Sequence, residues 1–420
     1  MAHVRAGDNG LEGIVQVVTL ACLVFMLTLG PASQAVLGQE IRLAHQWAEA
    51  VDGRDRAAQI FAQEVEVRFP GLKVRVTSGS PLKPAEVLAA LQAGRLEMAV
   101  FPLSYASAKV PEFALAGLPG LVPDLDAARE LKGSPMHTAL QALAQAQGIR
   151  LLTWWWVPGG FFAKDLQIFG PASVRGVRMQ ATNPLFERTL KAAGASVTNV
   201  PSTDFAGAMR SDKLDAVVTT YESFMSLRLS EHAKFATIGS SLFMDFCPLV
   251  ISVAAWKKLT PAQQKAFEEA AAISDAYFDA TQRDLARRME RTLRRREVAI
   301  WRMSQDDYLA WLSLAQKTAW AEYATINPRA KQLLLETVRT VLVARSDKDT
   351  LIDSLFGPTT RARIWRGLTQ AGAVEKTREQ HAAILGAIAS RQPELARSWA
   401  TVHVAGVEDW LRVALQEPVG

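Results

Sequence analysis

Hydrophobic and polar positions alternate between strand-like and helix-like patterns along most of the chain. The stretch from Ile41 has the pattern of a first strand, and residues 74–77 alternate as a second. Residues 85–93 follow a helical pattern that ends at Gly94, and 95–101 is a nearly continuous apolar run, typical of a strand covered on both faces. Strands that alternate with helices in this way predict α/β lobes with sheets flanked by helices.

The same alternation continues through the middle of the chain. Further helices are expected at 124–147 and 186–193, and further strands at 150–156, 176–180 and 214–220.

A much longer helical pattern follows, from Pro261 to Arg302. Thr260 and Gln263 have the spacing of a capping box, with Pro261 at the first helical position. A helix of this length is too long for one lobe.

The first 35 residues have the pattern of an export signal. Arg5 precedes an apolar run at 14–30, and the small residues Ser33 and Ala35 follow it. This order predicts a signal peptide, 1–35, with cleavage after Ala35, and therefore a periplasmic protein. The alternative is an uncleaved membrane anchor, since the run approaches spanning length.

Composition excludes several classes of protein. The net charge of +5 is small, and the arginine-rich stretch 283–302 has the pattern of one solvated helix face. Its one aromatic residue, Trp301, stands near its end and no aromatic residues alternate with the arginines before it, so no nucleic-acid partner is expected. After signal cleavage Cys247 is the one remaining cysteine, which leaves no internal disulfide. The chain has no Gly-x-Ser-x-Gly, phosphate-loop or Cys-x-x-Cys motif, so we expect neither an enzyme nor a cofactor.

Several short blocks occur in the order found in one transporter family. They are Ala44-His45, Pro111-Glu112-Phe113 with Leu118-Pro119, 175–180 with Gly194-Ala195, 215–220, and 256–264. Together, over about 41–342, the chain resembles the solute-binding proteins of TRAP (tripartite ATP-independent periplasmic) transporters. The resemblance implies a two-lobed periplasmic-binding-protein-like fold at 36–344, with one long helix spanning both lobes. It also implies capture of a small solute, usually an organic acid, and its delivery to a membrane permease.

The resemblance also locates a candidate ligand clamp. In most family members an arginine in a Gly-Leu-Lys-Ile-Arg pattern clamps the solute carboxylate. Aligning Gly176 with that glycine puts Gln180 at the arginine position and Arg178 at the lysine position, on the same side of the strand. Three interpretations follow. Arg178 serves as the clamp, or Gln180 binds a neutral or differently charged solute in its place, or neither side chain contacts the ligand.

Aromatic and hydroxyl side chains supply further candidates in the second lobe. Trp154 and Trp156 share one face of the predicted strand and Trp155 takes the other, so one face is core and the other is available to stack on a ligand. Thr219, Thr220 and Tyr221 stand where many relatives have Glu-Asn-Pro, whose asparagine reaches the ligand. Phe243 and Asp245 lie in the segment that returns to the first lobe, where Asp245 is either a partner for a cationic ligand group or a solvated carboxylate.

First-lobe candidates follow two predicted strands. His45 comes after the first strand with Gln46 and Trp47, and Ser104 follows the third with Tyr105. Crevices outside the carboxyl ends of strands are where α/β sheets bind ligands. His45 is read either as a ligand contact or as a hydrogen-bonded structural histidine.

Residues 345–420 form a second unit, predicted to be an all-α appendage. The stretches around His381 and His403 resemble the last helices of the FadR-type effector-binding domain of GntR regulators, in a truncated form without the DNA-binding domain. Histidines at those two positions are metal ligands in that family. Two ligands alone make an incomplete site, so no metal is predicted. The tail supports one alternative function, a ligand-sensing or regulatory protein.

Overall fold

The computed structural model describes residues 39–346, except 182, 199, 240 and 241, and helical stretches between 379 and 402. The predicted signal peptide lies outside the described residues, as do His381 and His403. No helix in the described part of the chain is long and apolar enough to cross a membrane.

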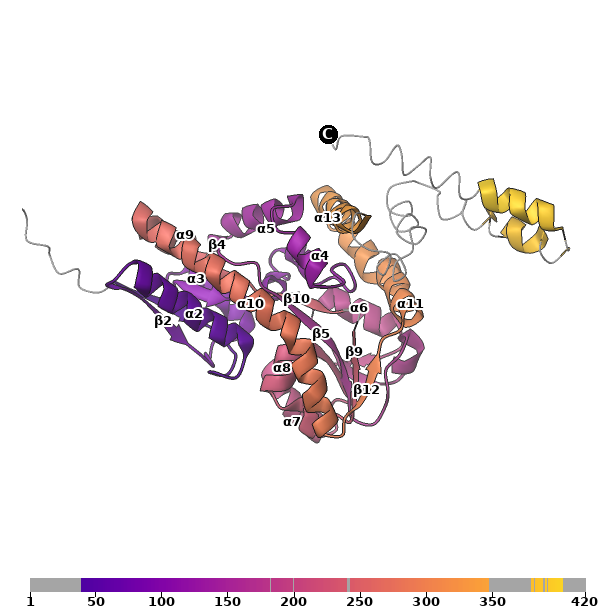
Figure 1. The fold of residues 1–420 in the computed structure, drawn as a ribbon, viewed down its shortest axis with the longest axis horizontal. Helices are drawn as coiled ribbons and strands as arrows, with labels where there is room; N and C mark the ends of the chain where they lie inside the picture. The colour runs from indigo at the N-terminus through magenta and orange to yellow at the C-terminus, as the bar shows by residue number, and fades with distance from the viewer. Residues whose placement is uncertain are drawn as a thin grey trace, which may run out of the picture.

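The chain folds into two α/β lobes, which confirms the predicted fold class (Figure 1). The first lobe contains a five-stranded sheet in the order β2 (Leu72–Thr77), β1 (Gln39–Ala44), β3 (Met98–Val100), β11 (Leu249–Ser252), β4 (Ile149–Leu151). Its first three strands are parallel, whereas β11 runs antiparallel to both of its neighbours. The chain therefore returns to the first lobe after completing most of the second.

The second lobe contains the larger sheet. Its order is β12 (Ala299–Arg302), β9 (Phe235–Ile238), β5 (Trp156–Ala163), β8 (Ala216–Thr220), β6 (Arg178–Gln180), β7 (Ser196–Val197), with β10 (Met244–Phe246) paired to the start of β5. Because β4 leads to β5 and β10 leads to β11, two extended connections pass between the lobes.

Helices cover both sheets. The α-helices are α2 (Gly53–Arg68), α3 (Pro84–Gln92), α4 (Leu125–Glu130), α5 (Pro135–Ala146), α6 (Pro184–Ala192), α7 (Phe205–Arg210), α8 (Tyr221–Ser226), α9 (Val253–Lys258), α10 (Pro261–Arg295), α11 (Gln305–Ala315), α12 (Ala321–Thr325) and α13 (Pro328–Ser346). Short 3-10 turns are η1 (Leu103–Ala106), η2 (Pro111–Gly117), η3 (Pro171–Val174), η4 (Ser202–Asp204) and η5 (Leu229–Glu231), and η6 (Gln316–Trp320) is a π-turn.

Helix α10 spans both lobes, as the sequence predicted (Figure 1). The expected capping box is present, with Thr260 Oγ1 accepting from the Gln263 amide and the Gln263 side chain accepting from the Thr260 amide. The helix ends at Arg295 rather than Arg302. A left-handed residue, Glu297, turns the chain, and 299–302 then pairs with β9 as a strand.

Two other predicted boundaries are wrong for local reasons. The helix expected at 124–147 is broken into α4 and α5, because Gly133 takes a positive φ and Ser134 caps a new helix that begins at Pro135. The strand expected at 150–156 stops at Leu151, and a new strand begins at Trp156 in the other sheet.

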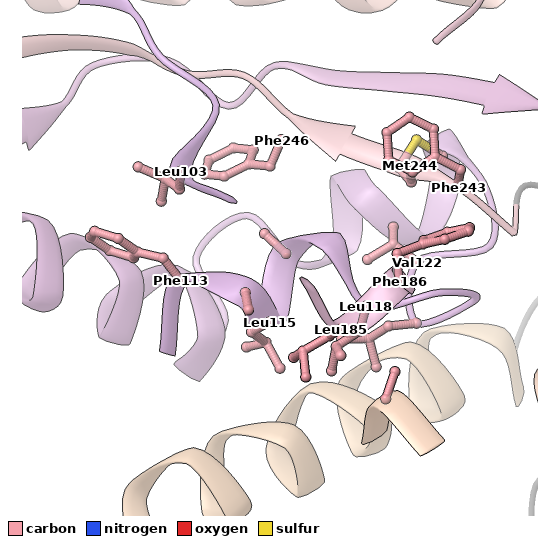
Figure 2. Packing of buried hydrophobic residues seen from close by; sticks show 14 of the residues in the cluster. Leu103, Phe113, Leu115, Leu118, Val122, Leu185, Phe186, Phe243, Met244 and Phe246 are labelled. Carbon is pink, nitrogen blue, oxygen red and sulfur yellow. The ribbon is translucent and has the colours of Figure 1, made fainter. Parts of the chain in front are cut away.

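Apolar packing ties the segment between β3 and α4 to the second lobe. Leu103, Leu115 and Leu118 are fully or almost fully buried, and they belong to the same cluster as Phe186 of α6 and Phe246 of β10 (Figure 2). The three consecutive tryptophans divide between two buried clusters, with Trp155 stacked 4.9 Å from Phe278 of α10 while Trp154 contacts Trp156.

We expect the chain to retain its fold and its binding activity when everything after Ala344 is deleted. Helix α13 buries Leu333, Leu334 and Val338 in the main cluster, and all three remain in the shortened chain. Calorimetry should therefore give an unchanged Kd and a melting temperature within about 2 °C of the full chain, a difference below roughly 0.5 kcal/mol. A shortened chain that does not fold would instead make the tail part of the domain.

Candidate functional site

A cavity of about 150 Å³ lies between the lobes, at the carboxyl ends of β1, β3, β6 and β8. Its lining comes from both lobes and from β10: Gln46, Trp47, Arg54, Ser104, Tyr105, Gln180, Val200, Pro201, Ser202, Phe205, Val218, Thr219, Thr220, Ser223, Phe243 and Asp245. The lining combines apolar side chains with a larger number of polar ones, and convergent polar groups orient a small molecule bound in a cavity.

Arg54, in the first turn of α2, is the one cationic side chain among the lining residues. It is 1% exposed, and its guanidinium lies 3.9 Å from the centre of the Trp47 ring. Its Nε and Nη2 donate to the two carboxylate oxygens of Asp52, each at 2.8 Å. Burial raises the pKa of Asp52, but the ion pair with Arg54 outweighs this and holds it below its ordinary value. The guanidinium and the carboxylate therefore remain charged together.

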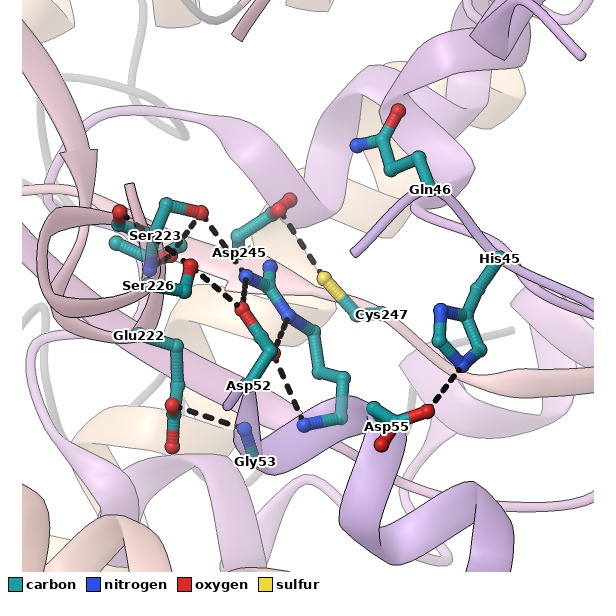
Figure 3. A network of polar contacts seen from close by, with 12 residues as sticks. His45, Gln46, Asp52, Gly53, Asp55, Glu222, Ser223, Ser226, Asp245 and Cys247 are labelled. Carbon is teal, nitrogen blue, oxygen red and sulfur yellow. Dashed lines mark hydrogen bonds and ion pairs between the residues drawn. The ribbon is translucent and has the colours of Figure 1, made fainter. Parts of the chain in front are cut away.

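The same turn of α2 binds the second lobe directly (Figure 3). Arg54 Nη2 donates to Ser223 Oγ at 2.9 Å, and Ser226 Oγ donates to Asp52 Oδ2 at 3.1 Å. The Gly53 amide donates to Glu222 Oε2 at 2.9 Å. We call this set the cross-lobe contacts; it joins the start of α2 to α8 and holds the lobes together over the cavity.

Helix α10 holds Glu222, one of the residues of the cross-lobe contacts, in place. Gln282 Nε2 donates to Glu222 Oε1 at 2.9 Å, so the Glu222 carboxylate is shared between α2 and α10. Burial, and then repulsion from Asp52, raise the pKa of Glu222. Contacts between the lobes are thus coupled to the helix that spans them.

Asp245 is a buried carboxyl in the cavity wall, not the solvated loop residue of one interpretation. Its Oδ2 accepts from Cys247 Sγ at 3.1 Å. Burial raises the pKa of Asp245, although the positive charge of Arg54 acts in the opposite direction. Nearby, Gln46 Nε2 donates to the Tyr105 hydroxyl at 2.8 Å, and burial raises the pKa of Tyr105.

The structure separates the two candidates for the clamp. Gln180 lines the cavity at the end of β6, where its Nε2 donates to the Ala181 carbonyl. Arg178 begins the same strand at the opposite end, and its exposed guanidinium pairs with Asp215, with Nε 2.8 Å from Oδ2. Arg178 is therefore not among the residues that line this cavity, which lies at the carboxyl end of β6.

The other predicted residues fall into two groups. Thr219, Thr220, Phe243 and Ser104 line the cavity, as does Asp245. They come from η1, β8, β10 and the residue before β10, and the tertiary fold brings them together with Gln180.

Four predicted residues lie elsewhere. Trp154 and Trp156 line a separate cavity of about 250 Å³ beside α10. The Tyr221 hydroxyl accepts from the Gly239 amide at 3.2 Å, and this side chain does not line the cavity between the lobes. His45 is buried with Nε2 3.1 Å from Asp55 Oδ1, and burial lowers its pKa, which fits a structural histidine.

Arg54, Phe205 and Ser223 are among the lining residues that were not sequence candidates. All three lie in the first turns of helices, where the sequence pattern is that of ordinary helix starts. Among the described residues no group of three or more histidine, cysteine, aspartate or glutamate side chains is arranged to hold a metal ion.

Comparison with known proteins relates most of the chain to one group. Residues 43–325 match the model of the bacterial extracellular solute-binding proteins, family 7. A protein of Albidiferax ferrireducens described as a solute-binding protein is 31% identical over 303 residues, which is 70% of this chain and 89% of that protein.

Solved structures agree with this assignment. A TRAP periplasmic solute-binding protein from Rhodoferax ferrireducens with bound malonate has a TM-score of 0.69 and 29% identity, covering 76% of this chain and all of that chain. An extracytoplasmic solute receptor of Bordetella pertussis that binds pyroglutamic acid has a TM-score of 0.65 at 19% identity, covering 71% of this chain and 99% of that chain, and shares the fold. The family match ends at 325, and none of these similarities supports the FadR-type resemblance of the tail.

Proposed function

The chain belongs to family 7 of the bacterial extracellular solute-binding proteins, and on that premise we propose that it binds a small organic acid in the cavity between its lobes and delivers it to a TRAP membrane permease. It is a solute-binding receptor that acts outside the cytoplasm, not an enzyme. Export by cleavage of a signal peptide after Ala35 is part of the proposal. So is the assignment of 36–344 as the solute-binding domain.

The observation that carries the proposal is the buried guanidinium of Arg54 in a cavity closed by both lobes. A carboxylate entering the cavity would meet this cation together with the Tyr105 hydroxyl, the Gln180 amide and the hydroxyls of Thr219 and Thr220. Charge-assisted hydrogen bonds to a guanidinium are among the stronger polar contacts in proteins. The malonate bound by the Rhodoferax ferrireducens relative is an acid of suitable size for such a cavity.

Capture would proceed by hinge closure. The two connections between the sheets and the helix α10 allow the lobes to move as rigid bodies about a hinge. Because the cross-lobe contacts are polar, the groups that form them can be hydrated when the lobes separate. An apolar interface of the same size would oppose opening much more strongly.

We expect Gln180→Ala to weaken binding of a hydroxy acid such as 3-hydroxypropionate by about tenfold, or ~1.4 kcal/mol, because it removes a hydrogen-bonding amide from the cavity wall. Arg178→Ala should change Kd by less than about twofold, since its exposed pair with Asp215 lies outside the cavity. Isothermal titration calorimetry of both variants against the unmodified protein measures this difference. Equal small effects would contradict a binding role for Gln180, and a larger effect of Arg178→Ala would restore the clamp interpretation.

A further inference from the structure

The charges in the cavity wall are balanced before any solute enters. Arg54 supplies the positive charge, and the paired carboxylate of Asp52 offsets it at 2.8 Å. Asp245 adds a second carboxyl on the wall itself. Tyr105 is the remaining titratable group among the lining residues, and burial keeps its hydroxyl neutral by raising its pKa. A solute with two carboxylates would therefore place its second negative charge in a cavity with no uncompensated cation.

Two groups in the wall require hydrogen-bond donors from a solute. Gln180 is 8% exposed, and its Nε2 already donates to the Ala181 carbonyl. Its Oε1 is buried and has no hydrogen-bond partner among the described residues. The opposite amide orientation would set Oε1 against a carbonyl oxygen, so Oε1 is the atom of this amide that is left without a partner. An unpaired buried acceptor costs free energy that a ligand donor recovers.

Asp245 is the second acceptor. The side chain that donates to it is the thiol of Cys247, at 3.1 Å, and a thiol is a weak donor. The charged or titratable groups that act on Asp245 are Arg54, Cys247 and Tyr105, and none of them is a lysine or histidine able to neutralise a bound dianion. Asp245 also accepts from the backbone of Phe246. The wall thus combines one balanced cation with a buried amide oxygen that has no partner, on Gln180, and a carboxyl bound by a weak thiol donor and a backbone amide.

We infer that Asp245 and Gln180 restrict the solute to a monocarboxylate that also carries a hydroxyl or amino donor, and that they discriminate against dicarboxylates of the same length. The single carboxylate binds near Arg54, and the donor binds Gln180 Oε1 and the Asp245 carboxylate. This inference rests on the proposed function, since it assumes that carboxylates bind in this cavity.

The test compares solutes that differ at one end alone. Malonate is matched by 3-hydroxypropionate and β-alanine, and succinate by 4-hydroxybutyrate and 4-aminobutyrate. Calorimetry of the full mature protein should show a hydroxy or amino acid binding at least about tenfold more tightly than the matched dicarboxylate, because the donor satisfies two acceptors. A preference for the amino member indicates an ion pair with Asp245, and a preference for the hydroxyl member indicates a neutral donor.

Asp245→Asn is the decisive variant. It keeps the shape of the side chain and removes the charge, so the preference over the dicarboxylate should shrink by about tenfold. Asp215→Asn is the matched control, because Asp215 pairs with Arg178 outside the cavity, and it should leave the preference unchanged. Because burial raises the pKa of Asp245, the carboxyl takes up a proton at a higher pH than an exposed aspartate does, so discrimination should weaken as the pH falls toward that raised pKa and remain flat in Asp245→Asn. A melting curve confirms that each variant is folded.

The outcomes separate the two proposals. Tighter binding of malonate or succinate, unaltered by Asp245→Asn, overturns this inference and leaves the proposed function intact. Failure of every carboxylate in both series to bind overturns the proposed function and this inference with it.

Discussion

Replacing Arg54 with alanine is expected to abolish malonate binding and to lower the free energy of unfolding by about 3–5 kcal/mol. The substitution leaves the Asp52 carboxylate buried without its cation and removes the hydrogen bond to Ser223 of the other lobe. It also removes the guanidinium that packs on Trp47. Urea unfolding gives the stability change, and titration calorimetry gives the loss of binding.

A double variant separates these two effects. In Asp52→Asn with Arg54→Gln both partners are neutral and of similar size, so no buried charge is left unpaired, and most of the stability should return. Binding should not return, because the cavity has lost its one lining cation. A double variant that regains malonate affinity would show that Arg54 has a structural role and that another group binds the carboxylate.

The second large effect is expected from Gly53→Ala. A Cβ at this position would lie 2.2 Å from Glu222 Oε1 and 2.8 Å from Glu222 Cδ. Glu222 is buried and held by Gln282 and by the Gly53 amide, so it cannot move without breaking those bonds. The variant should therefore favour separated lobes, with malonate affinity reduced by about 10–100-fold, or ~1.4–2.7 kcal/mol.

Small-angle scattering checks the cause of this change. At a malonate concentration that closes the unmodified protein, Gly53→Ala should keep a larger radius of gyration. Gly207→Ala is the matched control, since Gly207 lies in α7 with no atom near its added Cβ and no positive φ. A Gly53→Ala protein that closes and binds normally would mean that the cross-lobe contacts do not control closure.

These two residues suggest how closure and recognition are linked. Gly53 and Arg54 are neighbours at the start of α2, so the turn that binds the second lobe also presents the cation to the cavity. A solute that binds both lobes stabilises the closed state by its differential affinity for that state. The cross-lobe contacts also stabilise the closed state, and they do so without occupying the cavity.

The sequence resemblance and the structure indicate different positions for the cation that would bind a carboxylate. The family resemblance places the clamp on the second lobe, at the position of Gln180, whereas the cation that lines this cavity comes from the first lobe. With the cation on the first lobe, the second lobe presents the amide of Gln180, a group that both donates and accepts hydrogen bonds. This difference is the basis for expecting a solute with both a carboxylate and a donor group.

The sequence by itself determined the features that depend on local pattern. Period-two and helical periodicity identified the α/β lobes, and the Thr260–Gln263 spacing located the start of α10. These features could be predicted because neighbouring residues set them.

Tertiary structure alone decided which side chains share the cavity. Gly53 and Arg54 meet Glu222 and Ser223 across a separation of 169 residues, and no local pattern distinguishes Arg54 from an ordinary arginine in the first turn of a helix. The same holds for Arg178, which strand alternation placed beside Gln180 but which pairs with Asp215 outside the cavity. Side-chain direction follows from backbone periodicity, whereas burial and partner choice depend on how distant segments pack, and the binding site is made of those contacts.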